Sequence, residues 1–148
     1  MSEVPVFSFS QPEEKTGYLL WQATMRWQLR MNQQLRPVGV TLTQFSLLAG
    51  LYWLGRQGEA VTQQRLADYA NTDKMMTSKV LQTLERKGLV ERHSHRQDGR
   101  AKQLRLTLTG ETLLRQANAL VEQVDANFFG SLQLDIVLFN QFLHQLTG

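Results

Sequence analysis

Residues 89–108 carry the pattern of a β-hairpin that directly follows a basic, amphipathic helix. Gln103 to Leu108 alternates polar and apolar residues, which is the period of a half-buried strand. Leu89 to His93 reads as a second short strand, and Asp98 with Gly99 forms a strong hairpin-turn pair between the two. The expected tip of the hairpin is basic, because it carries Arg96, Arg100 and Lys102.

Two short helices are expected before the hairpin. Thr62 can cap a helix over Gln63 to Ala70, and Asn71 can take the left-handed conformation that closes it. Thr72 or Asp73 can cap a second helix that runs to about Lys87, where Gly88 fits the position just past the end. The expected core stripe of this second helix is Met76, Val80, Leu81 and Leu84.

The order of these elements is more informative than any one of them. Two helices joined by a tight turn form a helix-turn-helix pattern, and the basic hairpin adds a wing to its second helix. With a preceding helix that Thr43 is expected to cap, over Gln44 to Arg56, residues 43–108 are predicted to form a winged helix-turn-helix region. The predicted fold class is mainly α with a small β-hairpin, within a single domain over residues 1–148.

Long apolar helices are expected on both sides of this region. Residues 13–36 carry two apolar stripes at helical spacing, one through Trp21 and Met25 and the other through Trp27 and Met31. Residues 109–148 carry two more apolar helices. One small domain cannot cover this much apolar surface, so both segments are predicted to be dimerisation helices related by a two-fold axis. Packing of both stripes within one monomer is the alternative.

Charge is distributed unevenly along the 148 residues. Residues 62–105 hold ten Lys and Arg against five Asp and Glu, whereas the rest of the chain holds six basic and eight acidic residues. A concentration of positive charge in the predicted winged region is typical of a module that contacts phosphates.

Several classes of protein are disfavoured by the sequence. The chain has no cysteine, which excludes disulfides and thiolate metal sites within it. No signal peptide, membrane-spanning stretch, catalytic motif or cofactor fingerprint is recognisable, so we expect a cytoplasmic protein that is not an enzyme, needs no cofactor and has no membrane partner. His93 and His95 face the same way on a strand, but no third metal ligand is evident nearby, and we predict no metal site.

These residues resemble the multiple-antibiotic-resistance regulator (MarR) family of bacterial transcription factors. The matching segments are Leu66-Ala67, the run from Leu84 to Arg92, Asp98-Gly99-Arg100, and the run from Leu104 to Gly110. The sequence departs from the family pattern at Asn71, where glycine is common, and at Met75 and Met76, where small or β-branched residues are common.

The resemblance implies a homodimer that binds a pseudo-palindromic operator in double-stranded DNA. The second helix of the motif would lie in the major groove, and the wing arginines would enter the minor groove while Asp98 orients Arg100. Helical spacing turns Met75 outward on this helix, where its alternatives are contact with a thymine methyl and packing on Tyr69 or the turn. The predicted DNA-binding residues are Gln63, Arg65, Thr72, Lys74, Met75, Ser78, Lys79, Gln82, Arg96, Asp98, Arg100 and Lys102.

The resemblance also implies a small aromatic or phenolic effector, bound between the dimer helices and the winged region, that releases a repressor from DNA. Trp21, Met25, Tyr52 and Trp53 are the right kind of lining, but such residues are more often plain core, and no pocket residue is assigned. Three other functions stay open: an activator, a metal-responsive regulator that uses His93 and His95, and a winged helix that binds a protein partner.

Overall fold

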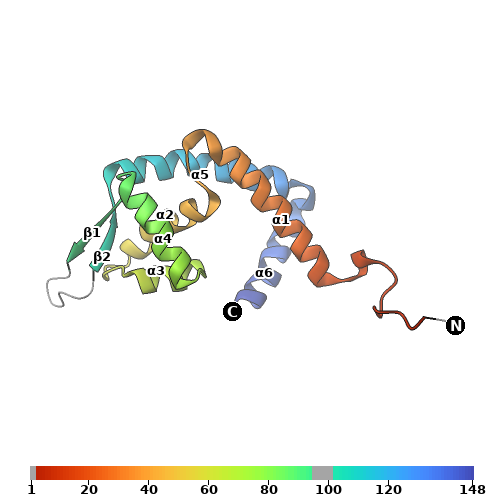
Figure 1. The fold of residues 1–148 in the computed structure, drawn as a ribbon. Helices are drawn as coiled ribbons and strands as arrows, with labels where there is room; N and C mark the ends of the chain where they lie inside the picture. The colour runs from red at the N-terminus through yellow and green to blue at the C-terminus, as the bar shows by residue number, and fades with distance from the viewer. Residues whose placement is uncertain (1–2, 95–101) are drawn as a thin grey trace.

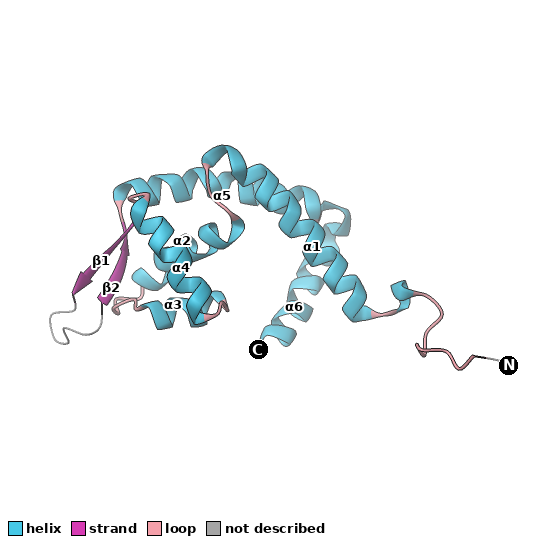
Figure 2. Cartoon of the chain, viewed as in Figure 1, coloured by secondary structure: helices cyan, strands magenta, loops and turns pink. Residues whose placement is uncertain are grey.

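The fold has a helical winged region at one end and two further helices at the other. The computed structural model describes residues 3–94 and 102–148. The helix α5, Leu108–Phe128, runs along the top of the molecule and connects the two ends (Figure 1). The predicted fold class, mainly helical with one β-hairpin, is confirmed (Figure 2).

The winged region contains three helices and the hairpin. Its helices are α2, Leu42–Gly55, α3, Gln63–Ala70, and α4, Lys74–Arg86. The strands β1, Val90–Ser94, and β2, Lys102–Leu106, pair antiparallel with Val90 opposite Leu106 and Ser94 opposite Lys102. The backbone N–H of Leu104 also donates to the carbonyl of Val61, 2.8 Å away, so the segment before α3 is tied to the outer edge of β2.

The helices of the other end are α1, Thr16–Leu35, and α6, Ile136–Thr147. Short 3-10 turns lie at Pro12–Glu14, Arg36–Val38 and Gly130–Asp135. The side chain Nε1 of Trp27 donates to Oδ1 of Asp125 at 2.8 Å, which ties α1 to α5. α1, α5 and α6 correspond to the segments that were predicted as 13–36 and 109–148, with end points that differ by a few residues.

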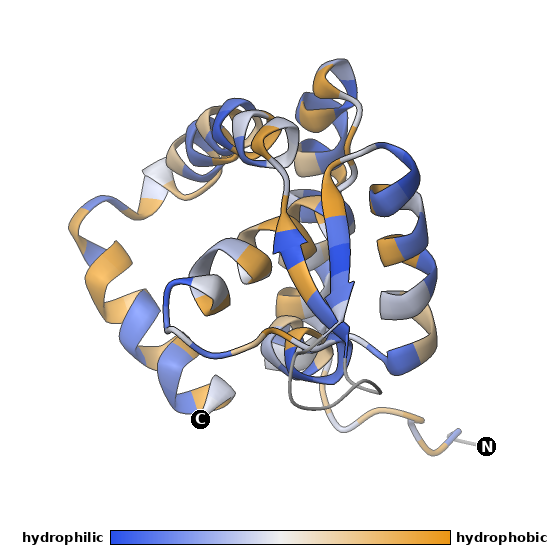
Figure 3. Cartoon of the chain, turned by 90° about the vertical axis from the view of Figure 1, so that its left-hand side faces the viewer, coloured by the Kyte–Doolittle hydropathy of each residue, from blue (hydrophilic) through white to orange (hydrophobic). Residues whose placement is uncertain are grey.

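The hydrophobic core lies between α2, α3, α4, α5, the hairpin and the carboxyl-terminal end of α1. Its fully buried members include Leu47, Leu48, Leu66, Leu81 and Leu104. Hydrophobic and hydrophilic residues alternate along β2 (Figure 3), whose Leu104 is buried in this core. β1 is hydrophilic after its first residue, Val90, which is also buried.

Two details of the helix predictions were wrong. α2 begins two residues earlier than expected, because Thr41 and not Thr43 is its cap. Thr41 accepts from the N–H of Gln44, and the Gln44 side chain accepts from the N–H of Thr41. In α4 the residue that faces the core is Thr77, which is fully buried, whereas Met76 is 40% exposed.

Within the part of the chain that the structure describes, no single helix is long and apolar enough to cross a bilayer. One pair, Thr16–Val38 with Leu42–Gly55, meets the length and composition criteria only when taken together, and it is bent by 78°.

Candidate nucleic-acid interface

The helix α4 presents a polar and cationic stripe to solvent. Its buried side consists of Thr77, Leu81 and Leu84. The opposite side is exposed, and the helical spacing of 3.6 residues per turn aligns four residues along it: Met75, Lys79, Gln82 and Arg86. Lys74 is also exposed, whereas Ser78 is half-buried at the edge of the stripe.

Arg86 was absent from the predicted site. It lies on the same exposed stripe as Lys79 and Gln82, and its Nη2 donates to Oγ1 of Thr83 at 3.1 Å. In the sequence Arg86 was considered only as part of the run from Leu84 to Arg92 that resembles the family, and not as a DNA contact. Rotation by helical spacing would have found it.

A hydrogen-bond chain holds the turn between α3 and α4. Asn71 closes α3 in the left-handed conformation, as predicted, with φ of 52°. Oγ1 of Thr77 donates to the carbonyl of Asp73 at 2.7 Å and lies 2.7 Å from Oγ1 of Thr72. Because a hydroxyl carries one proton, Thr72 is the donor of the second bond. Thr72, a predicted DNA contact, therefore also orients the start of α4.

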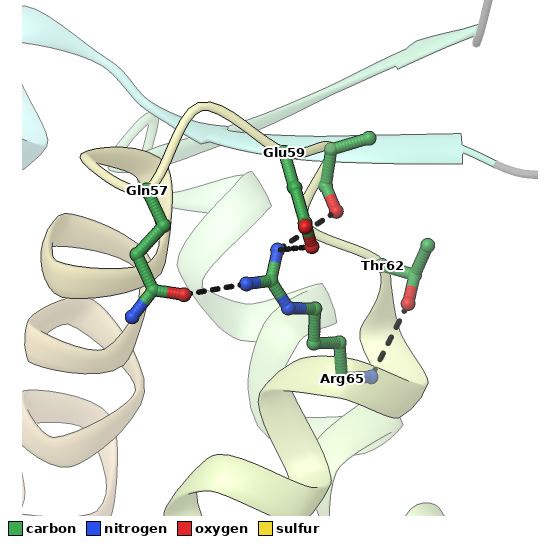
Figure 4. A network of polar contacts seen from close by, with 5 residues as sticks. Gln57, Glu59, Thr62 and Arg65 are labelled. Atoms are coloured by element: carbon green, nitrogen blue, oxygen red, sulfur yellow. Dashed lines mark hydrogen bonds and ion pairs between the residues drawn. The ribbon is translucent and has the colours of Figure 1, made fainter.

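Arg65 lies in a polar network that organises the segment before α3 (Figure 4). Its Nη2 donates to Oε1 of Gln57 at 2.6 Å, and its Nη1 donates to the carbonyl of Ala60 at 3.3 Å and lies 3.5 Å from a carboxylate oxygen of Glu59. The backbone N–H of Arg65 meanwhile donates to the cap Thr62 at 3.2 Å. The guanidinium was predicted to contact phosphate, and the structure shows it bridging residues 57–60.

A second guanidinium connects the helix-turn-helix to the hairpin. Nε of Arg92, in β1, donates to Oε1 of Glu85 in α4 at 2.8 Å, and its Nη2 donates to Oε1 of Gln63 in α3 at 3.2 Å. The Arg92 and Glu85 side chains are only 24% and 27% exposed. Arg92 therefore links the hairpin to both helices of the motif.

We expect Arg92→Met to lower the free energy of unfolding by about 1 to 2 kcal/mol, because it leaves the half-buried Glu85 carboxylate without its partner. Urea denaturation followed by circular dichroism measures the change. The matched control is Arg105→Met, at an exposed position on β2, with an expected change below about 0.5 kcal/mol. Equal losses for the two variants would contradict this role of Arg92.

The described part of the wing contains one of the predicted contacts. Lys102 is exposed and lies opposite Ser94 in the hairpin. Arg96, Asp98 and Arg100 lie outside the described residues, as does His95. Nε2 of His93 lies 2.9 Å from a carboxylate oxygen of Glu91, and the described residues contain no group of three side chains suited to a metal ion.

α1 and α6 expose apolar side chains at the end of the molecule away from the wing. On α1 Trp21 is 62% exposed and Leu29 is 59% exposed, while Met31 and Leu35 are buried against the core. The first of the two predicted stripes on this helix is thus uncovered in the monomer. α6 has no buried residue at all, and its exposed apolar residues include Val137, Leu138, Phe142 and Leu146.

A pocket of about 270 Å³ opens between α2 and α5. Two of the four aromatic or methionine residues considered from the sequence, Tyr52 and Trp53, line it, whereas Trp21 and Met25 do not. At its rim Nη2 of Arg115 donates to Oε1 of Glu111 at 2.6 Å. The other lining residues are Phe45, Ala49, Leu114 and Asn118.

α4 and the hairpin lie beside each other at the end of the molecule opposite α1 and α6 (Figure 1). This arrangement of two helices, a tight turn and an adjoining hairpin defines a winged helix-turn-helix protein. Residues 40–102 match the model of the MarR family.

Relatives and solved structures agree with that match. The chain is 41% identical over 123 residues to the HTH-type transcriptional regulator YdcH of Bacillus subtilis. The aligned segment covers 83% of this chain and 84% of the relative. It is 30% identical to the HTH-type transcriptional repressor Rv2887 of Mycobacterium tuberculosis, over 78% of this chain and 81% of that one.

Two structures, each 25% identical in sequence, superpose over most of the molecule. MepR of S. aureus in complex with DNA has a TM-score of 0.78 and covers 93% of this chain and 95% of its own. CouR of Rhodococcus jostii bound to p-coumaroyl-CoA has a TM-score of 0.80 and covers 93% of both chains. The chain belongs to the MarR family, so the prediction of a DNA-binding transcriptional regulator rather than an enzyme is confirmed.

Proposed function

We propose that the protein is a homodimeric repressor that binds a pseudo-palindromic operator through α4 and the wing and dissociates when a small aromatic molecule binds. The observation that carries the proposal is the exposed stripe of α4, with Lys79 and Arg86, on the same end of the molecule as the basic hairpin. Repression is supported by the similarity to the mycobacterial repressor, and DNA contact by the similarity to MepR.

In this proposal the twelve predicted residues divide into three groups. Side chains at the start of α4 and along its stripe contact base edges in the major groove: Lys74, Met75, Ser78, Lys79 and Gln82. Residues at the start of α3 and the turn position the phosphate backbone: Gln63, Arg65 and Thr72. Wing residues approach the minor groove and its phosphates: Arg96, Asp98, Arg100 and Lys102.

The dimer is proposed from the uncovered apolar faces of α1 and α6. α1 and α6 each leave large apolar side chains exposed, among them Trp21, Leu29, Phe142 and Leu146. A two-fold axis would let such a face cover its own copy. Two α4 helices related by such an axis would contact half-sites about one helical turn, roughly 34 Å, apart. A protein that binds chromosomal DNA in this way would act in the cytoplasm.

The proposed effector site is the pocket between α2 and α5. Tyr52 and Trp53 supply aromatic walls, and α5 connects the pocket to the hairpin and α4. The similarity to CouR, whose structure holds an aromatic thioester, supports an aromatic ligand here. In the proposed dimer the distance between the two α4 helices must match the spacing of the half-sites. A ligand that binds more tightly to a dimer in which this distance is different would shift the population away from the DNA-binding form.

Selection of duplexes from a random library by the purified protein tests this function. We expect enrichment of a two-fold-related motif, and an affinity that falls steeply with salt because lysines and arginines displace counterions from phosphates. Affinity measured by fluorescence anisotropy from 50 to 300 mM salt gives the slope. A protein that enriches no duplex at low salt would contradict the proposal and would favour a protein partner instead.

A further inference from the structure

Met75 is an apolar side chain left in water on the helix that is proposed to contact bases. It is 84% exposed, more than any other large apolar residue of α3 or α4. It is the second residue of α4, directly after Asp73 and Lys74, and the amino-terminal residues of such a helix are the ones that approach base edges. Burial within its own chain therefore does not account for the position of Met75.

The surroundings of Met75 are cationic and polar. Lys74 precedes it, and Lys79 and Gln82 follow it along the same exposed stripe. The one carboxylate beside it, Asp73, accepts from the backbone N–H of Met76 at 2.7 Å and so caps the helix. An apolar side chain beside two lysines fits an apolar group on the surface of a polyanion.

The base edges in the major groove of DNA display one apolar group, the C5-methyl of thymine. Guanine, adenine and the exocyclic amine of cytosine present only hydrogen-bond donors and acceptors, whereas thymine adds its C5-methyl group. Methionine has no donor and only a weakly accepting thioether, so it gains little from the polar edges. Its flexible, polarisable side chain packs well against a methyl group.

We infer that Met75 recognises the C5-methyl group of a pyrimidine, in thymine or 5-methylcytosine, at one position of each half-site. This inference rests on the proposed function, because it requires α4 to lie in the major groove. It makes Met75 a specificity-determining residue and makes operator binding sensitive to a single methyl group per half-site.

Deoxyuridine substitution tests the inference, because uracil keeps every hydrogen-bonding group of thymine and lacks only the methyl. Each thymine of the enriched duplex is replaced by deoxyuridine in turn, at both symmetric positions, and affinity is measured by fluorescence anisotropy. We expect one symmetric pair to weaken binding by about fourfold per methyl, or roughly 15-fold for the dimer. At the remaining thymine positions, deoxyuridine should change the binding affinity by less than about twofold.

Variants of Met75 assign the effect to this side chain. With Met75→Ala and with the nearly isosteric but polar Met75→Gln, the thymine and deoxyuridine duplexes should bind equally well, whereas Met75→Leu should keep most of the difference. The exposure of Met75 means that all three variants should melt like the wild type by circular dichroism. The matched control, Gln82→Ala, changes another residue of the stripe and should retain the full methyl effect.

The outcomes separate this inference from the proposed function. A methyl effect at one pair that vanishes in Met75→Ala supports the inference. Enriched duplexes with no methyl effect, or an effect of the same size in Met75→Ala, overturn it and leave DNA binding intact. Failure to enrich any duplex overturns the proposed function and the inference together.

Discussion

Replacing Gly110 by alanine is expected to lower the free energy of unfolding by about 3 kcal/mol, at the upper end of what overpacking costs. Gly110 is buried in the first turn of α5, and a Cβ atom there would come closer than 3.0 Å to the carbonyl oxygen and carbon of Leu89. These are backbone atoms, so no side-chain rotation can relieve the overlap. Thermal and urea denaturation measure the loss.

The same junction connects α5 to the end of α4. Oγ1 of Thr107 donates to the carbonyl of Gly88 at 2.6 Å and accepts from the N–H of Gly110 at 3.0 Å, and the N–H of Thr107 donates to the carbonyl of Leu89 at 3.1 Å. Any methyl group at Gly110 must therefore push α5 away from the connection between α4 and β1. We expect Gly110→Ala to weaken DNA binding as well as stability.

Gly55→Ala is the control for this prediction. Gly55 ends α2, and a Cβ atom built on it meets nothing within 4 Å. Its stability should change by less than about 1 kcal/mol, and its DNA affinity should stay that of the wild type. A Gly110→Ala protein as stable as Gly55→Ala would show that the close approach of α5 to Leu89 is not maintained in solution.

Arg100→Ala is expected to weaken operator binding by at least about 100-fold and to leave the folded dimer unchanged. Each dimer would carry two such arginines, and each charge-assisted contact to the minor groove is worth about 1.5 to 3 kcal/mol. Fluorescence anisotropy with the enriched duplex measures affinity, and size-exclusion chromatography checks the dimer.

Arg105→Ala is the comparison for the wing. Arg105 is exposed on β2, opposite Glu91 in the body of the hairpin, away from the turn. Its loss should cost less than about fivefold in affinity, in line with a peripheral charge. Unchanged binding by Arg100→Ala would remove the wing arginine from the proposed mechanism.

Periodicity and turn residues predicted the order of the elements well. The bounds of α3 and the conformation of Asn71 were predicted correctly, because an oxygen-bearing cap and a residue that tolerates positive φ are local signals. The hairpin was predicted for the same reason, since alternation of apolar residues is visible within six positions.

Errors arose where packing and pattern disagree. Met76 was assigned to the core on hydrophobicity, yet Thr77 occupies it, because the hydroxyl of Thr77 is satisfied by Asp73 and Thr72 and thus costs little to bury. Thr43 was predicted as the cap of α2, but the reciprocal bonds with Gln44 make Thr41 the cap.

Long-range polar contacts had no signal in the sequence. Arg92 meets Gln63 across 29 positions, and Arg65 reaches back to Gln57, so neither bond follows from helical or strand spacing. Arg65 was predicted to contact phosphate, and in the structure its guanidinium, like that of Arg92, holds protein segments together. The assignment of the predicted contacts to DNA stays a prediction for experiments to decide.

Hydroxyl-radical footprinting of the enriched duplex tests most directly whether the two protomers of a dimer contact DNA at the same time, each through α4 and the wing. We expect two regions of protection related by two-fold symmetry and centred about one helical turn, roughly 34 Å, apart, with outer minor-groove protections that disappear in Arg100→Ala. A single unpaired region of protection would contradict the proposal that a two-fold dimer binds the operator. Protections that no substitution in α4 or the wing alters would contradict the proposal that these elements contact DNA.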